Sequence, residues 1–183
     1  MKFDYVSLML INMAAGFFLL ACFVLEDLEK VNPKRWVSAF LLSGAIAFLC
    51  GLHMTWTWPL PGSYNTAYGE LSVLLGGLLL AAALSLAQGW DLKPLGIYGF
   101  FAGLVAVITG IQFIRLGLSK TPFCAGIGFI LSGSAGLFSW PVLIWRSNKT
   151  IRLISGVILI FVTCLWGLLA CMAYWAHLAM PVK

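Results

Sequence analysis

Six apolar stretches divide this chain, and they constrain its fold more than any other feature. They cover residues 5–25, 36–54, 68–87, 94–116, 122–145 and 151–175. Each has the length of about 20 residues that crosses the hydrocarbon core of a bilayer, where only a helix pairs all its backbone groups. The 183 residues are 62% hydrophobic and only 9% charged, which is more apolar surface than a soluble core can hide. We therefore predict an all-α polytopic membrane protein in a lipid bilayer, with a single six-helix transmembrane domain over residues 1–183.

The distribution of Lys and Arg predicts how the spans are oriented. Seven of the 11 cationic side chains lie in or beside the joints that follow spans one, three and five, and four lie on the other side. Cationic residues accumulate on the cytoplasmic side of a membrane. Both termini are therefore expected outside, in a prokaryotic cytoplasmic membrane. The net charge of +5 is explained by this anchoring, and we expect no nucleic-acid partner.

Small residues recur within the spans and predict close helix packing. Gly99 and Gly103 form a GxxxG pattern, and span five contains four further glycines with two serines among them. Such residues let helices approach closely in lipid, either within one protomer or in a homo-oligomer. The segments LLSGAIAFL in span two and ILSGSAGLF in span five are similar and would run in opposite directions. This similarity is typical of a 3+3 inverted repeat.

The joint between spans two and three, residues 53–70, contains the densest group of aromatic and polar side chains. It has no Lys or Arg, and its centre, Trp58-Pro59-Leu60-Pro61-Gly62, predicts a stiff turn rather than a helix. We expect this turn to shape an outer mouth or to hold the bundle closed. Together with polar residues of the later spans, it supplies the candidates for a pore mouth or gate. These are His53, Trp56, Trp58, Tyr64, Asn65, Tyr68, Glu70, Gln112, Arg115 and His177.

Three of these candidates have alternative roles that the sequence leaves open. Glu70 either favours the positive end of a helix dipole, acts as a titratable gate, or makes a polar contact with a permeating solute. Arg115 ends span four on the same side, where it could pair with Glu70. His53 and His177 either ligate a haem b, bind a metal together with Glu70, sense pH, or only hydrogen-bond at the interface. No catalytic motif is present, so we expect neither an enzyme nor a catalytic or metal site.

Three short motifs resemble the urea/amide channel family. They are KVNPK at 30–34, YGELSVLLGG from Tyr68, and GWDLKP at 89–94. The resemblance implies six short spans, outside termini, a ring-shaped oligomer and a pore for a small neutral solute in each protomer. Spans three and five lack most of the aromatic residues that narrow the pore in that family. The segment WPLPGSYNTAYGE also resembles an uncharacterised bacterial and archaeal membrane family, catalogued as a domain of unknown function.

These observations favour passive conduction of a small neutral solute, such as urea or a short amide, without a cofactor. A haem- or metal-binding electron-transfer subunit that uses His53 and His177 is the first alternative. The second is a membrane scaffold or accessory subunit without a solute path. A fully packed protomer interior without a cavity would favour the scaffold, a continuous polar path would favour conduction, and a visible absorption spectrum would reveal haem.

Overall fold

The computed structural model describes residues 5–26, 32–119 and 121–179 of the chain, and these residues form six long helices and no strand. Each long helix is long and apolar enough to cross a membrane, which confirms the predicted all-α membrane fold. Two short segments, the 3-10 helix η1 (Pro33–Trp36) and the π-helix η2 (Asn65–Glu70), precede the second and third long helices. The long helices are α1 (Val6–Leu25), α2 (Val37–Thr57), α3 (Leu71–Gln88), α4 (Lys93–Leu116), α5 (Pro122–Ile144) and α6 (Lys149–Leu178).

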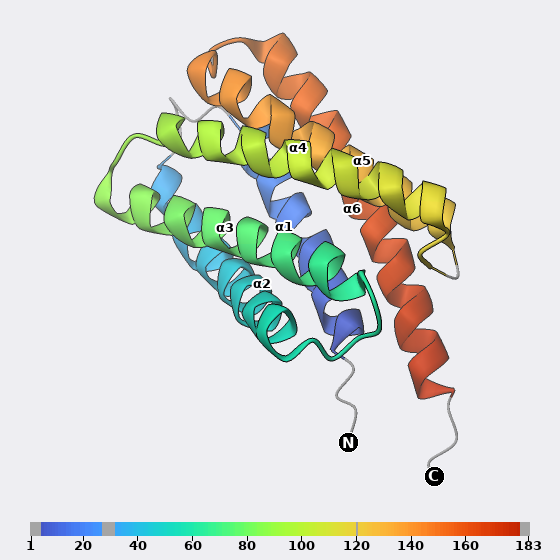
Figure 1. Ribbon diagram of the computed structural model, residues 1–183. Coiled ribbons are helices and arrows are strands. Elements are labelled where there is room, and N and C mark those ends of the chain that lie inside the picture. Colours follow the sequence, from blue (N-terminus) through green and yellow to red (C-terminus); the bar gives the residue numbers. More distant parts are fainter. Residues whose placement is uncertain (1–4, 27–31, 120, 180–183) are drawn as a thin grey trace.

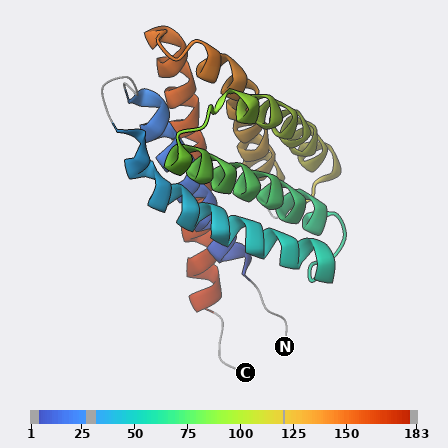
Figure 2. The same ribbon diagram turned by 90° about the vertical axis from the view of Figure 1, so that its left-hand side faces the viewer.

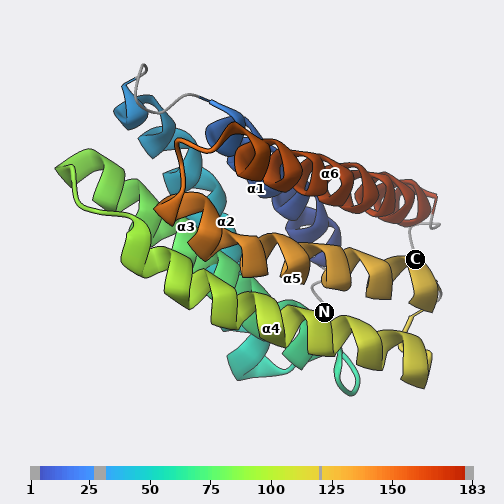
Figure 3. The ribbon, with the colours of Figure 1, turned by 90° about the horizontal axis from the view of Figure 1, so that it is seen from above.

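The six helices form a ring in which each helix packs against two neighbours (Figures 1 and 3). Three pairs of helices are packed most extensively: α1 with α6, α2 with α3, and α4 with α5. The seams between these pairs, α1 with α2, α3 with α4, and α5 with α6, are looser. The ring therefore consists of three tight helix pairs, while the inverted relation between its two halves stays a prediction.

The start of α1 and the end of α6 lie at one end of the bundle (Figures 1 and 2). We call this the terminal end and the other the opposite end. Helices α1, α3 and α5 run from the terminal to the opposite end, and α2, α4 and α6 return. An even number of spans requires this arrangement. Which end faces the outside stays a prediction from the Lys and Arg distribution.

The tight pairing of α4 with α5 depends on glycines at the contact. A methyl group built on Gly103 would lie 2.5 Å from the carbonyl oxygen of Gly133, and one on Gly133 would lie 2.5 Å from that of Gly103. Any side chain at either position would therefore force the helices apart. The close approach predicted from the GxxxG pattern is confirmed at this pair.

Candidate functional site

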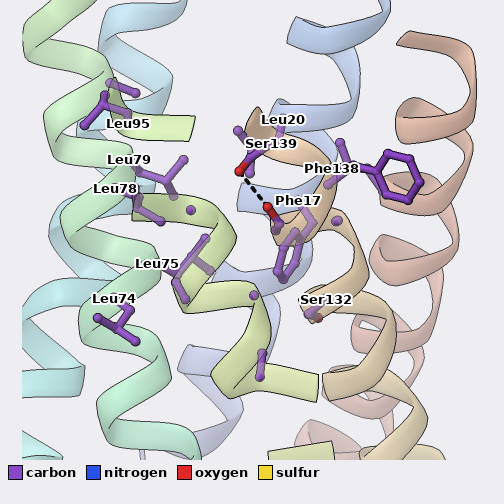
Figure 4. Close-up of a pocket in the computed structure, with 18 of the residues that line it drawn as sticks. Phe17, Leu20, Leu74, Leu75, Leu78, Leu79, Leu95, Ser132, Phe138 and Ser139 are labelled. Atoms are coloured by element: carbon purple, nitrogen blue, oxygen red, sulfur yellow. Dashed lines mark hydrogen bonds between the residues drawn. The ribbon is translucent and has the colours of Figure 1, made fainter. Parts of the chain in front are cut away.

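A cavity of about 200 Å³ lies inside the ring and is lined by residues from all six helices and from η2. We call it the chamber. Leucine, alanine, glycine and phenylalanine make up most of its wall, and Figure 4 shows several of these side chains together with Ser132 and Ser139. The wall contains no charged side chain among the residues that the structure describes. The interior of the protomer is therefore hollow and apolar.

Aromatic rings close the chamber toward the terminal end. The Tyr68 and Phe129 rings line the chamber, with their centroids 5.3 Å apart. Phe113 packs 5.1 Å from Phe129 and 5.9 Å from Tyr68, and Trp166 packs 5.1 Å from Phe129. Tyr64 stacks on the outer side of Tyr68 at 6.4 Å. We call these five residues the aromatic cluster.

The position of the aromatic cluster follows from the helix directions. Ala67 and Tyr68 of η2 precede the α3 residues of the wall, and Phe129 is the first wall residue of α5, so these residues mark the terminal limit of the chamber. Phe113 and Trp166 lie further toward the terminal end than any wall residue of α4 or α6. The cluster therefore separates the chamber from the terminal end of the bundle.

Trp166 is fixed within the aromatic cluster by a hydrogen bond and by a glycine. Its side chain is fully buried, and its Nε1 donates to the Ser132 hydroxyl oxygen at 2.9 Å. Ser132 in turn donates to the carbonyl oxygen of Gly128 at 2.7 Å. A methyl group on Gly128 would lie 2.9 Å from the indole ring, so only glycine leaves room for it. The indole is therefore held in one orientation.

A second hollow of about 340 Å³ lies at the opposite end, beside the joint between α3 and α4. It shares Phe23 and Leu92 with the chamber wall, so these two side chains lie between the two spaces. Asp91 and Arg146 give this hollow a polar border. The hollow therefore adjoins the chamber at its opposite end.

The joint 53–70 is a fastened turn, as its Pro and Gly content predicts. Trp58 ends α2 in the left-handed conformation with a φ of 49°, the only non-glycine residue with positive φ in the described parts of the chain. The fully buried Asn65 amide accepts from the backbone N–H of Leu60 at 3.0 Å. It also donates to the carbonyl oxygens of Leu60 and Gly62. Asn65 therefore pairs the backbone groups that Pro59 and Pro61 prevent from joining a helix.

His53 and His177 lie at the terminal end and hydrogen-bond to different residues at the start of α1. His53 Nδ1 is 2.8 Å from the Tyr5 hydroxyl oxygen, and His177 Nδ1 is 3.1 Å from the Ser7 hydroxyl oxygen. Burial raises the pKa of Tyr5, and the nearby Cys50 thiol adds to this shift. The two histidines fasten α1 to α2 and to α6. The described residues contain no group of three His, Cys, Asp or Glu that could hold a metal ion, and the haem alternative stays a prediction.

The structure places the ten sequence candidates in different surroundings. Tyr68 lines the chamber, Tyr64 belongs to the aromatic cluster, and Asn65 fastens the turn. The exposed candidates are Trp56, Trp58, Glu70, Gln112 and Arg115, together with His53, which keeps its Tyr5 contact. His177 is half-buried and contacts Ser7. Their role at a mouth or in gating stays a prediction. Sequence reasoning missed Phe113, Phe129, Trp166 and Ser72, although a Trp in the middle of span six was a detectable signal.

The fold is that of two solved structures of the Helicobacter pylori urea channel. The closed-state structure covers 94% of this chain and 98% of that chain, with a TM-score of 0.73 and 18% sequence identity. The match to the crystal structure of the urea channel covers 93% of this chain and 98% of that chain, with a TM-score of 0.71 and 18% sequence identity. The expected resemblance to the urea channel is confirmed at the level of the fold.

No curated protein matches this chain. A family model described as a protein of unknown function, DUF981, matches residues 1–180. Because that match extends over nearly the whole chain, the chain belongs to the DUF981 family.

Proposed function

We propose that each protomer conducts a small neutral solute passively between the two ends of the bundle. The observation that carries this proposal is the chamber, lined by all six helices, with a hollow at one end and an aromatic closure at the other. A scaffold without a solute path would need no such space. The similarity of the fold to that of the urea channel also supports a channel function.

The absence of charge in the wall supports a neutral solute. An ion in the chamber would lose its hydration without gaining a partner, which costs far more than transferring a neutral molecule. Conduction from the chamber to the terminal end requires the Tyr68 and Phe129 rings to separate. In this proposal, the structure with these two rings in contact therefore represents the closed state of the channel.

The remaining parts of the proposal concern the surroundings of the protomer. The protein acts as a channel rather than as an enzyme, and it assembles as a homo-oligomer in the cytoplasmic membrane of a prokaryote. The terminal end faces outward, in line with the Lys and Arg distribution. The glycines of α4 and α5 pack against each other inside the protomer, so the oligomer interface is formed by other surfaces of the protein.

The test is swelling of liposomes that contain the purified protein in gradients of urea and of short amides. We expect faster swelling than in empty liposomes. Ala102→Phe fills the chamber and should return the rate toward that of empty liposomes, whereas Leu104→Phe on the exposed face of α4 should not. Rates equal to those of empty liposomes for every solute, in the wild type and in a variant with a smaller residue at Phe129, would exclude conduction.

A further inference from the structure

The chamber wall contains two hydroxyl-bearing side chains, one helical turn apart, whose hydroxyls have no hydrogen-bond partner in the described parts of the chain. Tyr68 and Ser72 are 8% and 2% exposed, and both line the chamber. Neither hydroxyl oxygen is among the fully buried unpaired atoms, so both remain accessible at the chamber surface. A spacing of four residues places both side chains on the same face of a helix. This pair therefore has unused hydrogen-bonding capacity, which a ligand in the chamber can fill.

The other hydroxyls in the middle of the chamber already form hydrogen bonds within the protein. Ser132 donates to Gly128 and accepts from Trp166. The Ser139 hydroxyl lies within hydrogen-bond distance of the carbonyl oxygens of Gly96 and Gly136, which share its one proton. Ser155, near the start of α6, is the wall serine whose hydroxyl is fully buried and unpaired in the described residues, and it lies away from the aromatic cluster. The free hydrogen-bonding capacity next to the aromatic cluster therefore comes from Tyr68 and Ser72.

The rest of the chamber is long and apolar. Its α3 wall extends from Tyr68 to Ala82, which is roughly 20 Å at the helical rise of 1.5 Å per residue. Leu71, Leu75 and Leu79 are among the α3 residues that line this length. An engineered apolar cavity of about 150 Å³ stays dry and binds benzene, so a chamber of this size favours an apolar guest over water. Its elongated form suits a linear molecule.

We infer that the chamber is a binding site for an uncharged, linear molecule with an alkyl body and one hydroxyl-type head. The head donates to and accepts from the Tyr68 and Ser72 hydroxyls, and the alkyl body lies along the α3 leucines. The absence of charge from the wall excludes fatty acid anions and amines. The inference rests on the chamber alone and does not require the molecule to cross the membrane.

Urea fits this site poorly. It has four N–H donors and one carbonyl oxygen, and most of them would face leucine, alanine or phenylalanine side chains. Each unpaired polar group that leaves water is costly. The chamber therefore binds small solutes that are polar on all sides only weakly, which does not prevent their passage, and it retains molecules with a single polar end.

The experiment is equilibrium binding of radiolabelled hexan-1-ol to the full-length protein in lipid nanodiscs. Nanodiscs without protein measure the partition into lipid, which is subtracted. We expect saturable binding of one molecule per protomer, and we expect Ala135→Phe to abolish it, because this variant fills the chamber. Unlabelled urea at the same concentration should not displace the alcohol.

The hydroxyl pair is tested with conservative variants. Tyr68→Phe combined with Ser72→Ala should weaken hexan-1-ol binding about fivefold or more, as expected for the loss of one or two hydrogen bonds. The matched control combines Tyr98→Phe on the exposed face of α4 with Ser134→Ala, whose hydroxyl bonds to Ile130 on its own helix. The control should bind like the wild type. Circular dichroism and gel filtration check that each variant is folded.

Three outcomes would overturn the inference. These are the absence of saturable binding, unchanged affinity in the Tyr68 and Ser72 double variant, and displacement by urea as effective as by unlabelled hexan-1-ol. A tightly held phospholipid that hexan-1-ol does not displace, seen by native mass spectrometry, would also overturn it. Urea conduction in liposomes is a separate result, so the channel proposal and the binding site can fail independently.

Discussion

The ring of Tyr68 lies 5.3 Å from the ring of Phe129, and these two residues belong both to the chamber wall and to the aromatic cluster. Tyr68 comes from η2 and Phe129 from α5, elements that lie on different sides of the ring of helices. A small separation of these elements would open the chamber toward the terminal end. The contact is therefore a place to test for gating.

Phe129→Leu should increase solute flux because it removes one ring of this contact and keeps an apolar side chain. We expect urea-driven swelling of liposomes to become several times faster than with the wild type. The lost packing should lower stability by about 1–3 kcal/mol. Phe101→Leu is the matched control, since Phe101 is 61% exposed on α4. An unchanged swelling rate in folded Phe129→Leu would show that this contact is not the gate.

Gly128 and Trp166 should be coupled in a double-mutant cycle. Gly128→Ala places a methyl group 2.9 Å from the indole and should destabilise the protein by about 1–3 kcal/mol, as overpacked sites do. Trp166→Phe removes the benzo ring that meets this methyl group, although it also loses the bond to Ser132. Thermal unfolding in detergent should show that the double variant is more stable than the two single effects predict. Strict additivity would contradict the contact.

Gly103→Ala should separate α4 from α5, because its methyl group would lie 2.5 Å from the carbonyl oxygen of Gly133. We expect a loss of about 1–3 kcal/mol, measured by thermal unfolding. Gly77→Ala is the matched control. Its methyl group would lie 3.8 Å from the Phe48 ring, and alanine favours the helix by roughly 1 kcal/mol. Equal destabilisation by both variants would mean that the α4–α5 contact is not specific.

Asn65→Ala should loosen the joint 53–70 because three backbone groups of Leu60 and Gly62 lose their partner. Leaving buried backbone groups unpaired costs about 1–3 kcal/mol. We expect a lower unfolding temperature and faster proteolytic cleavage between residues 58 and 64. Thr66→Ala, at an exposed neighbouring position, should behave like the wild type. Unchanged cleavage in Asn65→Ala would contradict the fastening role of the amide.

The purified protein should show no Soret band if His53 and His177 serve only as hydrogen-bonding partners of Tyr5 and Ser7. The measurement is a visible absorption spectrum taken without added haem and again after haem titration. A band that disappears in both His53→Ala and His177→Ala would instead establish the electron-transfer alternative. His53→Ala alone should loosen the start of α1, since it removes the contact with the Tyr5 hydroxyl.

The aromatic closure shows where prediction from the sequence stopped. Spans three and five lack most of the aromatic residues of the urea/amide channel pattern, and the sequence therefore indicated no aromatic narrowing. The structure builds one from η2, α4, α5 and α6. Phe113 and Phe129 looked like ordinary lipid-facing or core residues because a single apolar residue within an apolar span carries no periodic signal. Of these residues only Trp166 carries a detectable signal, because Trp is usually found near span ends and Trp166 lies in the middle of span six.

The sequence by itself determined that the chain is an all-α membrane protein with six spans, because length and apolar composition alone decide whether a segment is stable in lipid. It also determined the stiff turn at 58–62, since Pro and Gly restrict the backbone locally. The tertiary structure alone decided which face of each helix meets the chamber. In an apolar span every face is compatible with lipid, so only the packing of the other five helices selects the inward residues. The hydroxyls of Tyr68 and Ser72 became a candidate site only when that packing enclosed them without a partner.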